Sequence, residues 1–181
     1  MRFDETDLPG VTLIQPRMVG DHRGFFMETW HRVKFGAAGI DVDFVQDNHS
    51  RSVIGTLRGL HYQLRHPQGK LVRVVAGEVF DVAVDLRRSS PTFGHSLGVT
   101  LSAADATELW IPPGFAHGFY VTSESADLVY KCTDVYVPED ERTIRWDDPM
   151  LAIAWPIGAE GPVLSARDRR GIALADAEVY E

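Results

Sequence analysis

Short runs of alternating apolar and polar residues, each ending near Gly, Pro, Asp or Ser, follow one another along most of the chain. Alternation with a period of two places successive side chains on opposite faces of an extended chain, so these runs predict β-strands. The predicted strands are 11–15, 25–30, 53–57, 70–75, 78–86, 95–101, 108–111, 119–122, 128–137 and 143–146. Many short strands at close spacing favour an all-β sandwich or barrel over alternating βα units.

Turn signals separate the predicted strands, and helix signals are few. The sequence Val-Ala-Gly-Glu-Val at 75–79 predicts a tight hairpin turn between two strands. Pro-Pro-Gly at 112–114 predicts another break, because proline fixes φ and glycine tolerates positive φ. Short helical turns are expected at 31–38, stopped by Gly39, and at 167–170. With no repeat and no linker, the chain reads as one domain spanning 1–181.

Composition narrows the possible classes of protein. A length of 181 residues is enough to bury a core, and no apolar run approaches the roughly 18–20 residues that cross a bilayer. The acidic N-terminus lacks the apolar stretch of a signal peptide, so a cytoplasmic location is expected. A formal net charge of −8 argues against a nucleic-acid partner. The single cysteine, Cys132, can form neither an internal disulfide nor a Cys-based zinc site.

Two segments place reactive side chains at strand positions. In the sequence Arg-Gly-Leu-His-Tyr-Gln at 58–63, His61 and Gln63 share one face of a strand. If that face lines a cavity, an imidazole and an amide project into it; otherwise His61 is a core histidine held by a hydrogen bond. Lys70 opens an apolar strand, either as a solvated strand end or as a cation aimed at a developing oxyanion.

A second histidine follows a proline–glycine turn. The pattern Pro-x-Gly-x-x-His ends at His117, and its spacing resembles the second motif of cupin barrels. The first cupin motif supplies His-x-His in metal-binding members, but this chain has His61-Tyr62-Gln63 there. Two histidines and one amide make a poor zinc or iron site, so we expect no metal and histidines that are free to move protons.

The predicted strand 128–137 would place Tyr130, Cys132, Asp134 and Tyr136 on one face. Two tyrosines facing a cavity could act as an acid and as a stacking platform, although half-buried tyrosines are also common in sheets. Cys132 is expected to be a small core residue, because nothing in the local sequence lowers the pKa of its thiol.

Together these segments resemble the dTDP-4-dehydrorhamnose 3,5-epimerase family. Seven motifs match in order, among them Asp-x-Arg-Gly-Phe-Phe, Gln-Asp-Asn, Leu-Arg-Gly-Leu-His-Tyr-Gln and Gln-Gly-Lys-Leu-Val. Their positions are 21–26, 44–50, 57–63, 68–72, 112–119, 130–131 and 138–146. The resemblance implies an all-β, cupin-type jelly-roll barrel with a few short helices, a homodimer, and a dTDP-linked 4-keto-6-deoxy sugar as substrate. It implies inversion at C3 and C5 on the route to dTDP-rhamnose.

The resemblance also implies roles for individual residues. His61 matches the general base, Asp168 the carboxylate that orients it, Tyr130 the opposed proton donor, and Lys70 the cation near the ketone oxygen. Positions that match contacts to the nucleotide sugar are Arg23, Phe26, Glu28, Gln46, Asp47, Asn48, Arg58, Lys70, His117, Tyr136, Glu141 and Arg167, with Tyr136 stacking on thymine. Removing a proton beside a ketone gives an enolate, so the substrate carries its own electron sink and no cofactor is expected.

Two positions depart from the family pattern, and three alternative functions remain. Arg167 stands where the family usually has lysine, and Val135 where it usually has tyrosine. An epimerase acting on C3 only or C5 only would have the same motifs. A metal-dependent cupin oxygenase is disfavoured by the missing His-x-His, and a catalytically inactive sugar-binding module would have no need of a base and an opposed acid.

Overall fold

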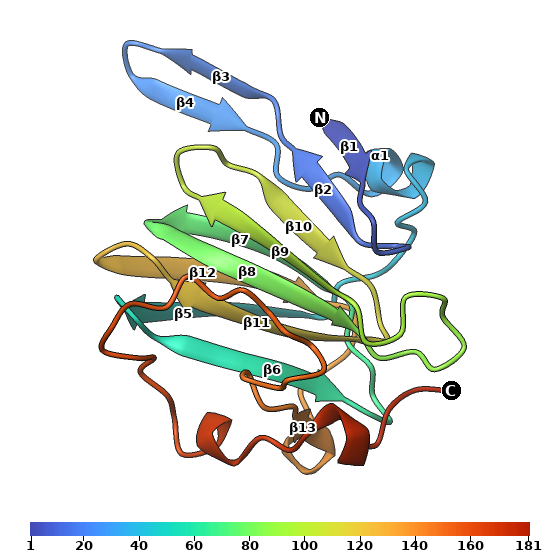
Figure 1. Ribbon diagram of the computed structural model, residues 1–181. Coiled ribbons are helices and arrows are strands. Elements are labelled where there is room, and N and C mark those ends of the chain that lie inside the picture. Colours follow the sequence, from blue (N-terminus) through green and yellow to red (C-terminus); the bar gives the residue numbers. More distant parts are fainter.

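Two antiparallel sheets contain most of the strands in the computed structural model, which describes residues 1–181 (Figure 1). The six-stranded sheet has the spatial order β1 (Arg2–Glu5), β2 (Thr12–Gln15), β10 (Glu108–Ile111), β7 (Lys70–Ala76), β12 (Ser125–Cys132) and β5 (Gln46–Val53). The five-stranded sheet has the order β13 (Glu141–Thr143), β6 (Leu57–Gln63), β11 (Phe115–Val121), β8 (Glu78–Asp85) and β9 (Ser96–Ser102). The mostly-β prediction is therefore confirmed, although the strands form two separate sheets rather than one closed barrel.

The two sheets face each other across the main hydrophobic core. Val72 of β7 and Leu128 of β12, from the six-stranded sheet, pack in one cluster with Val79 of β8 and Phe119 of β11, from the five-stranded sheet. Each of these side chains is at most 6% exposed. Burial of such side chains contributes roughly 1.5–3 kcal/mol each, so this shared core holds the sheets together.

The outer face of each sheet is also covered. Leu60 and Val84 of the five-stranded sheet pack against Leu151 and Leu174 of the C-terminal part of the chain, which contains the short helices η2 (Asp168–Arg170) and η3 (Leu174–Asp176). On the six-stranded sheet a smaller cluster forms around the helix α1 (Arg32–Ala37), with Phe35 fully buried. The C-terminal segment is thereby brought against β6, and η2, which begins at Asp168, contacts this strand.

The chain crosses between the sheets at tight corners. Strands β7 and β8 are separated by Gly77 alone, yet they pair with different neighbours in different sheets. The predicted hairpin at 75–79 is therefore wrong, although the tight turn itself is present. Gly77 has φ +73°, and a Cβ there would lie 2.0 Å from the carbonyl oxygen of Ser125, so only glycine fits this corner.

Most predicted strands are present within a few residues, and 108–111 matches β10 at both ends. The strand expected at 53–57 is wrong, because Gly55, with φ +76°, turns the chain from β5 into β6. The strand expected at 128–137 ends at Cys132, and Asp134 and Tyr136 lie in the following loop. There the Asp134 side chain accepts a hydrogen bond from the Val135 amide, which favours a turn.

A two-stranded arm projects away from the sheets (Figure 1). It consists of β3 (Met18–Asp21) and β4 (Gly24–Met27), and it exposes 62% of Phe25 and 75% of Phe26. The predicted strand 25–30 corresponds to β4, whereas β1, β3 and β5 were missed, and the strand expected at 143–146 shares only Thr143 with β13. Helix α1 agrees with the expected helical segment, and its N-cap is the side chain of His31, which accepts a hydrogen bond from the Val33 amide. None of the helices is long and apolar enough to cross a membrane.

Glu108, at the start of β10, is 1% exposed and makes the stability of the fold depend on pH. Burial raises its pKa from the ordinary 4.5 to about 8, although Arg73, 3.8 Å away, acts in the opposite direction. The folded state thus keeps a proton that the unfolded chain releases between these values. Stability is therefore lost as the pH rises through this window.

We predict that Glu108→Gln removes this loss. At pH 8 the variant should have a free energy of unfolding higher than wild type by about 1 kcal/mol or more, because it needs no proton to stay neutral. At pH 5 the two proteins should agree within about 0.5 kcal/mol. Urea unfolding at both pH values measures the difference, and an equal effect at pH 5 and pH 8 would contradict the assignment.

Candidate active site

A polar cavity of about 340 Å³ lies between the two sheets and collects residues from six strands and three loop positions. Ten of the predicted site residues line it: Gln46, Asn48, Arg58, His61, Lys70, His117, Tyr130, Tyr136, Glu141 and Arg167. We call it the central pocket. Phe119 also lines it, and Tyr130 packs against the main core, so the pocket lies directly against the hydrophobic interior.

The two sheets contribute different chemistry to the central pocket. His61 on β6 and His117 on β11 come from the five-stranded sheet, and they are directly paired in the register of these strands. Lys70 on β7 and Tyr130 on β12 come from the six-stranded sheet. Because the sheets face each other, a ligand in the pocket has imidazoles on one side and an ammonium and a phenol on the other.

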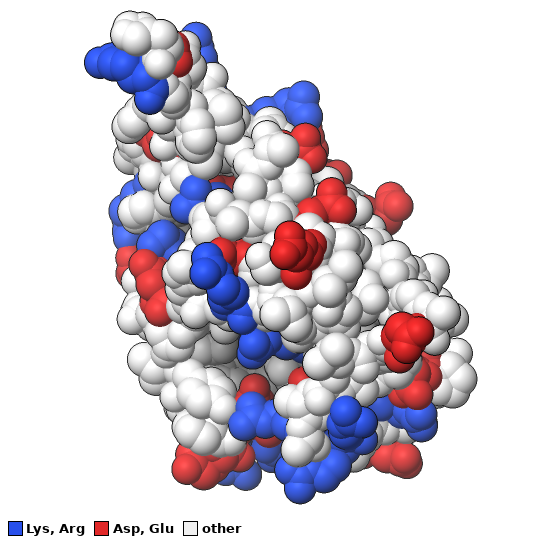
Figure 2. All heavy atoms as spheres, turned by 90° about the vertical axis from the view of Figure 1, so that its left-hand side faces the viewer, with Lys and Arg blue, Asp and Glu red and all other residues white.

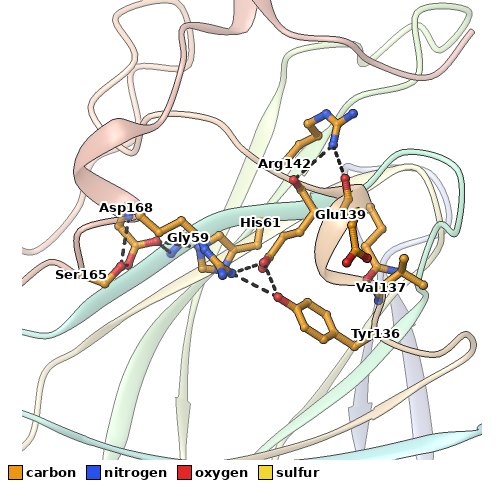
Figure 3. A network of polar contacts seen from close by, with 11 residues as sticks. Gly59, His61, Tyr136, Val137, Glu139, Arg142, Ser165 and Asp168 are labelled. Carbon is orange, nitrogen blue, oxygen red and sulfur yellow. Dashed lines mark hydrogen bonds and ion pairs between the residues drawn. The ribbon is translucent and has the colours of Figure 1, made fainter.

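His61 is held by a buried carboxylate. Its Nε2 lies 2.6 Å from Oδ1 of Asp168, whose side chain is 3% exposed, and Oδ2 of Asp168 accepts a hydrogen bond of 2.6 Å from Ser165 (Figure 3). With Nε2 donating to the carboxylate, the neutral ring presents the lone pair of Nδ1. Burial alone would raise the pKa of Asp168, but hydrogen bonds from His61 and Ser165 outweigh it and lower the pKa.

His117 has a carboxylate of its own. Its Nε2 lies 2.9 Å from both oxygens of Asp81, which is fully buried. No three side chains of His, Cys, Asp or Glu come together where they could hold a metal ion. Each histidine of the central pocket therefore has one carboxylate partner, Asp168 for His61 and Asp81 for His117.

A close approach of two glycines allows β6 and β11 to carry the histidines next to each other. A Cβ at Gly59, where φ is +135°, would lie 2.5 Å from Cα of Gly118 and 3.0 Å from the carbonyl oxygen of His117. The register between the strands shifts at this point, between His117 and Phe119. A larger residue at Gly59 would push the strands apart and move both imidazoles.

The cations of the central pocket differ in whether an acid neutralises them. Lys70 makes no ion pair, and burial lowers the pKa of its ammonium group. Arg58 donates to Ser52 at 3.0 Å and also has no carboxylate partner. Arg167, in contrast, pairs through Nη1 with Oε2 of Glu141. Lys70 and Arg58 are therefore the uncompensated positive charges that an anionic ligand meets, and Figure 2 shows Lys and Arg side chains at the edge of a hollow in the surface.

The two tyrosines reach the pocket by different routes. Tyr130 lies on β12, and burial raises the pKa of its phenol, which keeps the hydroxyl protonated. Tyr136 reaches the mouth of the pocket from the loop after β12, not by strand alternation. Its hydroxyl donates to Glu141 at 2.7 Å, and its amide donates to the side chain of Gln46 at 2.8 Å.

Four predicted contact residues do not line the central pocket in this chain. Arg23 and Phe26 lie on the projecting arm, where Arg23 pairs with Asp21. Glu28 pairs with Lys34 at 2.6 Å. Asp47 lies on β5 between Gln46 and Asn48, so its side chain points to the outer face of the sheet, where Lys131 binds it at 2.9 Å.

The sequence reasoning missed several residues of the site: Ser50, Gln68, Asp81, Phe119 and Ser165. Ser50 could have been found, because it continues the alternation of Gln46 and Asn48 along one strand. Asp81 could not, since its pairing with His117 depends on which strands become neighbours in the sheet.

An all-β protein with an oriented imidazole on one side of a polar pocket, and a phenol and an unpaired ammonium on the other, has the equipment of an acid–base isomerase. The model of one family, described as dTDP-4-dehydrorhamnose 3,5-epimerase, matches residues 5–176. A Pseudomonas aeruginosa protein of that name is 56% identical over 181 residues and 99% of each chain. This chain belongs to the dTDP-4-dehydrorhamnose 3,5-epimerase family.

Solved structures agree with this assignment. The Legionella pneumophila dTDP-6-deoxy-D-glucose-3,5-epimerase, in complex with dTDP-4-keto-L-rhamnose, superposes with a TM-score of 0.95 at 51% identity, covering 98% of this chain and 94% of that one. A 3'-monoepimerase from Streptomyces bikiniensis, in complex with dTDP-quinovose, reaches a TM-score of 0.88 at 34% identity, covering 95% and 87%. The fold is thus shared by proteins described as double epimerases and as single epimerases.

Proposed function

We propose that this chain epimerises C3 and C5 of dTDP-4-dehydro-6-deoxy-glucose and so produces dTDP-4-dehydro-L-rhamnose. The observation that carries the proposal is that His61, oriented by Asp168, and Tyr130 line one pocket from two sheets that face each other. Inversion at carbon requires a base on one face of the sugar and an acid on the other. A base alone would return the proton to the face it came from.

In the first step, Nδ1 of His61 removes the proton from the carbon beside the C4 ketone. The ring becomes an imidazolium, which the Asp168 carboxylate stabilises through Nε2. This carboxylate also holds the neutral tautomer in which Nδ1 is the acceptor, as the aspartate of a hydrolytic triad does. A positioned base of this kind is worth about 10²–10⁴-fold in rate.

The electron pair left by the proton moves to the ketone oxygen, which becomes an enolate. Lys70 is proposed to stabilise this oxygen, because its ammonium has no protein counter-ion and lies in the same pocket. A donor aimed at a developing oxyanion typically contributes about 2.7–4 kcal/mol. Tyr130 then donates its proton to the carbon from the opposite face. Before the second carbon reacts, His61 releases its proton to solvent and Tyr130 takes one up from solvent.

The nucleotide part of the substrate is proposed to bind toward the mouth of the pocket. Arg58, without an acid partner, suits the diphosphate, and the half-exposed ring of Tyr136 suits thymine. Arg167 is tied to Glu141, so its charge is less available to phosphate than that of Arg58.

We further propose that the fold is a cupin-type jelly roll and that the chain acts as a homodimer. Successive strands repeatedly change sheet, as β5 to β6 and β7 to β8 do, which is typical of a jelly roll. The arm carries Arg23 and Phe26, which do not line the pocket of their own chain, together with exposed apolar side chains. A second copy would cover that apolar surface and could receive these residues at its own site.

The reaction is tested by deuterium incorporation. In heavy water, the wild-type chain should convert the 4-keto substrate with two deuteriums, one at C3 and one at C5. His61→Asn should lose both exchange and inversion. Tyr130→Phe should lose inversion while exchange persists, because the base still removes protons but nothing donates them from the other face. Mass spectrometry and NMR measure these outcomes.

Tyr120→Phe is the matched control, since Tyr120 is buried on β11, makes no side-chain hydrogen bond and does not line the central pocket. A single deuterium in the wild-type product would favour an epimerase of one carbon. Full inversion by Tyr130→Phe would contradict the assigned acid.

Lys70→Met should lower kcat about 10²–10³-fold, with a smaller effect on dTDP affinity, because the enolate forms only during the reaction. Since burial lowers the pKa of Lys70, wild-type kcat should fall as the pH rises through a value below the ordinary 10.5. This alkaline limb should be absent from the variant. Lys131→Met, on the outer face of the same sheet, is the control. An unchanged kcat in Lys70→Met would remove Lys70 from the mechanism.

The homodimer is tested by sedimentation. The wild-type chain should sediment at about twice 20.2 kDa. Replacing Val19 and Phe25 on the arm by serine should shift it toward the monomer, because these side chains are 55% and 62% exposed in the isolated chain. Met150→Ser removes a similarly exposed apolar group elsewhere and should leave the dimer intact. A fully active 20.2 kDa wild-type monomer would refute the proposal.

A further inference from the structure

The two oxygens of the Asp168 carboxylate have different partners. Oδ1 faces Nε2 of His61 at 2.6 Å and the Gly59 amide at 3.4 Å. Oδ2 accepts from the hydroxyl of Ser165 at 2.6 Å, and that hydroxyl in turn accepts from the Asp168 amide at 3.1 Å. Figure 3 shows Asp168 between Ser165 on one side and Gly59 and His61 on the other.

Ser165 and Asp168 lie in one turn of the chain, and hydrogen bonds to β6 and to neighbouring segments hold the backbone before and after this turn. On one side, Val163 bonds with both Gly55 and Leu57 through its amide and its carbonyl. On the other, Ile172 forms an isolated bridge with Ile144 and donates to the carbonyl of Thr143. These anchors place the Asp168 backbone, but they leave the rotation of its carboxylate undetermined. The Ser165 hydroxyl is the only side-chain group, apart from His61 itself, that bonds this carboxylate.

We propose that Ser165 is a positioning residue of the reaction: its hydroxyl fixes the rotation of the Asp168 carboxylate and thereby the direction in which His61 presents Nδ1. The proposal rests on the proposed function of His61 as the base. Ser165 touches no substrate in this scheme. It acts through Asp168, three residues along the chain, within a turn that serine and threonine both favour.

The electrostatics of the site agree with this role. The hydrogen bond from Ser165 is one of the contributions that hold the pKa of Asp168 below its usual range despite burial. Other charged groups line the cavity beside this turn: Arg58 and His61 from β6, with Arg167 and Arg170 from the turn itself. None of these arginines bonds the carboxylate, so none replaces the hydroxyl when it is removed.

The test compares Ser165→Ala with Ser165→Thr, which keeps the hydroxyl. In Ser165→Ala, kcat should fall about ten- to a hundredfold, as expected for losing one hydrogen bond to a charged group. KM and dTDP affinity should change less than threefold, and the acid limb of kcat/KM should move to higher pH, because Asp168 loses a donor to its charged form. The ¹⁵N shifts of the His61 ring should change as well. Ser165→Thr should restore kcat and the pH profile.

Ser90→Ala is a matched control. It removes a serine-to-aspartate hydrogen bond of the same 2.6 Å length, to Asp85, outside the central pocket. It should leave kcat and the pH profile unchanged, so a general loss of stability is separated from an effect on the base.

The outcomes distinguish this proposal from the function on which it rests. A wild-type chain that exchanges no substrate protons would refute the function itself. An active wild type with Ser165→Ala equally active and unshifted in pH would refute the role of Ser165. If Ser165→Ala does not fold, Ser165→Cys takes its place, because a thiol is a weaker hydrogen-bond donor than a hydroxyl. A kcat for Ser165→Cys that lies between the kcat of Ser165→Thr and that of His61→Asn would support the role of Ser165. A kcat and a pH profile equal to those of the wild type would refute it. Equal losses in Ser165→Thr and Ser165→Ala would also count against the hydroxyl.

Discussion

The position of the proposed base and acid on two opposed sheets is the constraint from which the rest of the site follows. An imidazole on β6 and a phenol on β12 cannot come to the same side of a bound sugar unless the sheets themselves move, and the shared core of Val72, Leu128 and Phe119 prevents this. Protein interiors are packed as densely as organic crystals, so such a core resists deformation. In the proposed reaction, the packing of the two sheets therefore determines the faces of the sugar from which the proton is removed and returned, in addition to the chemistry of the two side chains.

Polar and charged groups that lie between two sheets need hydrogen-bond or ion-pair partners, and in this pocket some of them have such partners and others do not. Each pocket histidine has an acid, Asp168 or Asp81, and Arg167 has Glu141. Lys70 is left without a partner although burial disfavours its charge. An unpaired, partly buried cation costs stability, so its retention at this place is understandable if the proposed enolate forms there during each turnover. Lys70 is thus kept charged without a partner at some cost in stability, whereas the two pocket histidines and Arg167 are paired with carboxylates.

Local patterns in the sequence predicted where strands occur better than they predicted which strands pair with each other. The period of two identified β10 and most other strands, and the order of the motifs identified ten residues of the pocket. The corner at Gly77 was mistaken for a hairpin because a tight turn looks the same whether the next strand joins the same sheet or the other one. The family motif could not show that the side chain of Asp47 lies outside the central pocket, because a motif does not specify the face of the strand on which a residue lies. Asp81 and Ser165 depend on contacts that only the folded chain creates.

The proposed base and its carboxylate are far apart in the chain, since His61 and Asp168 are separated by 107 positions. During synthesis from the N-terminus, both sheets and all of the central pocket except Arg167 can therefore assemble around an imidazole that still lacks this carboxylate. Only when the segment beyond Val163 docks along β6 is the tautomer set. The imidazole and the carboxylate that is proposed to orient it consequently reach the site at different moments in the synthesis of the chain.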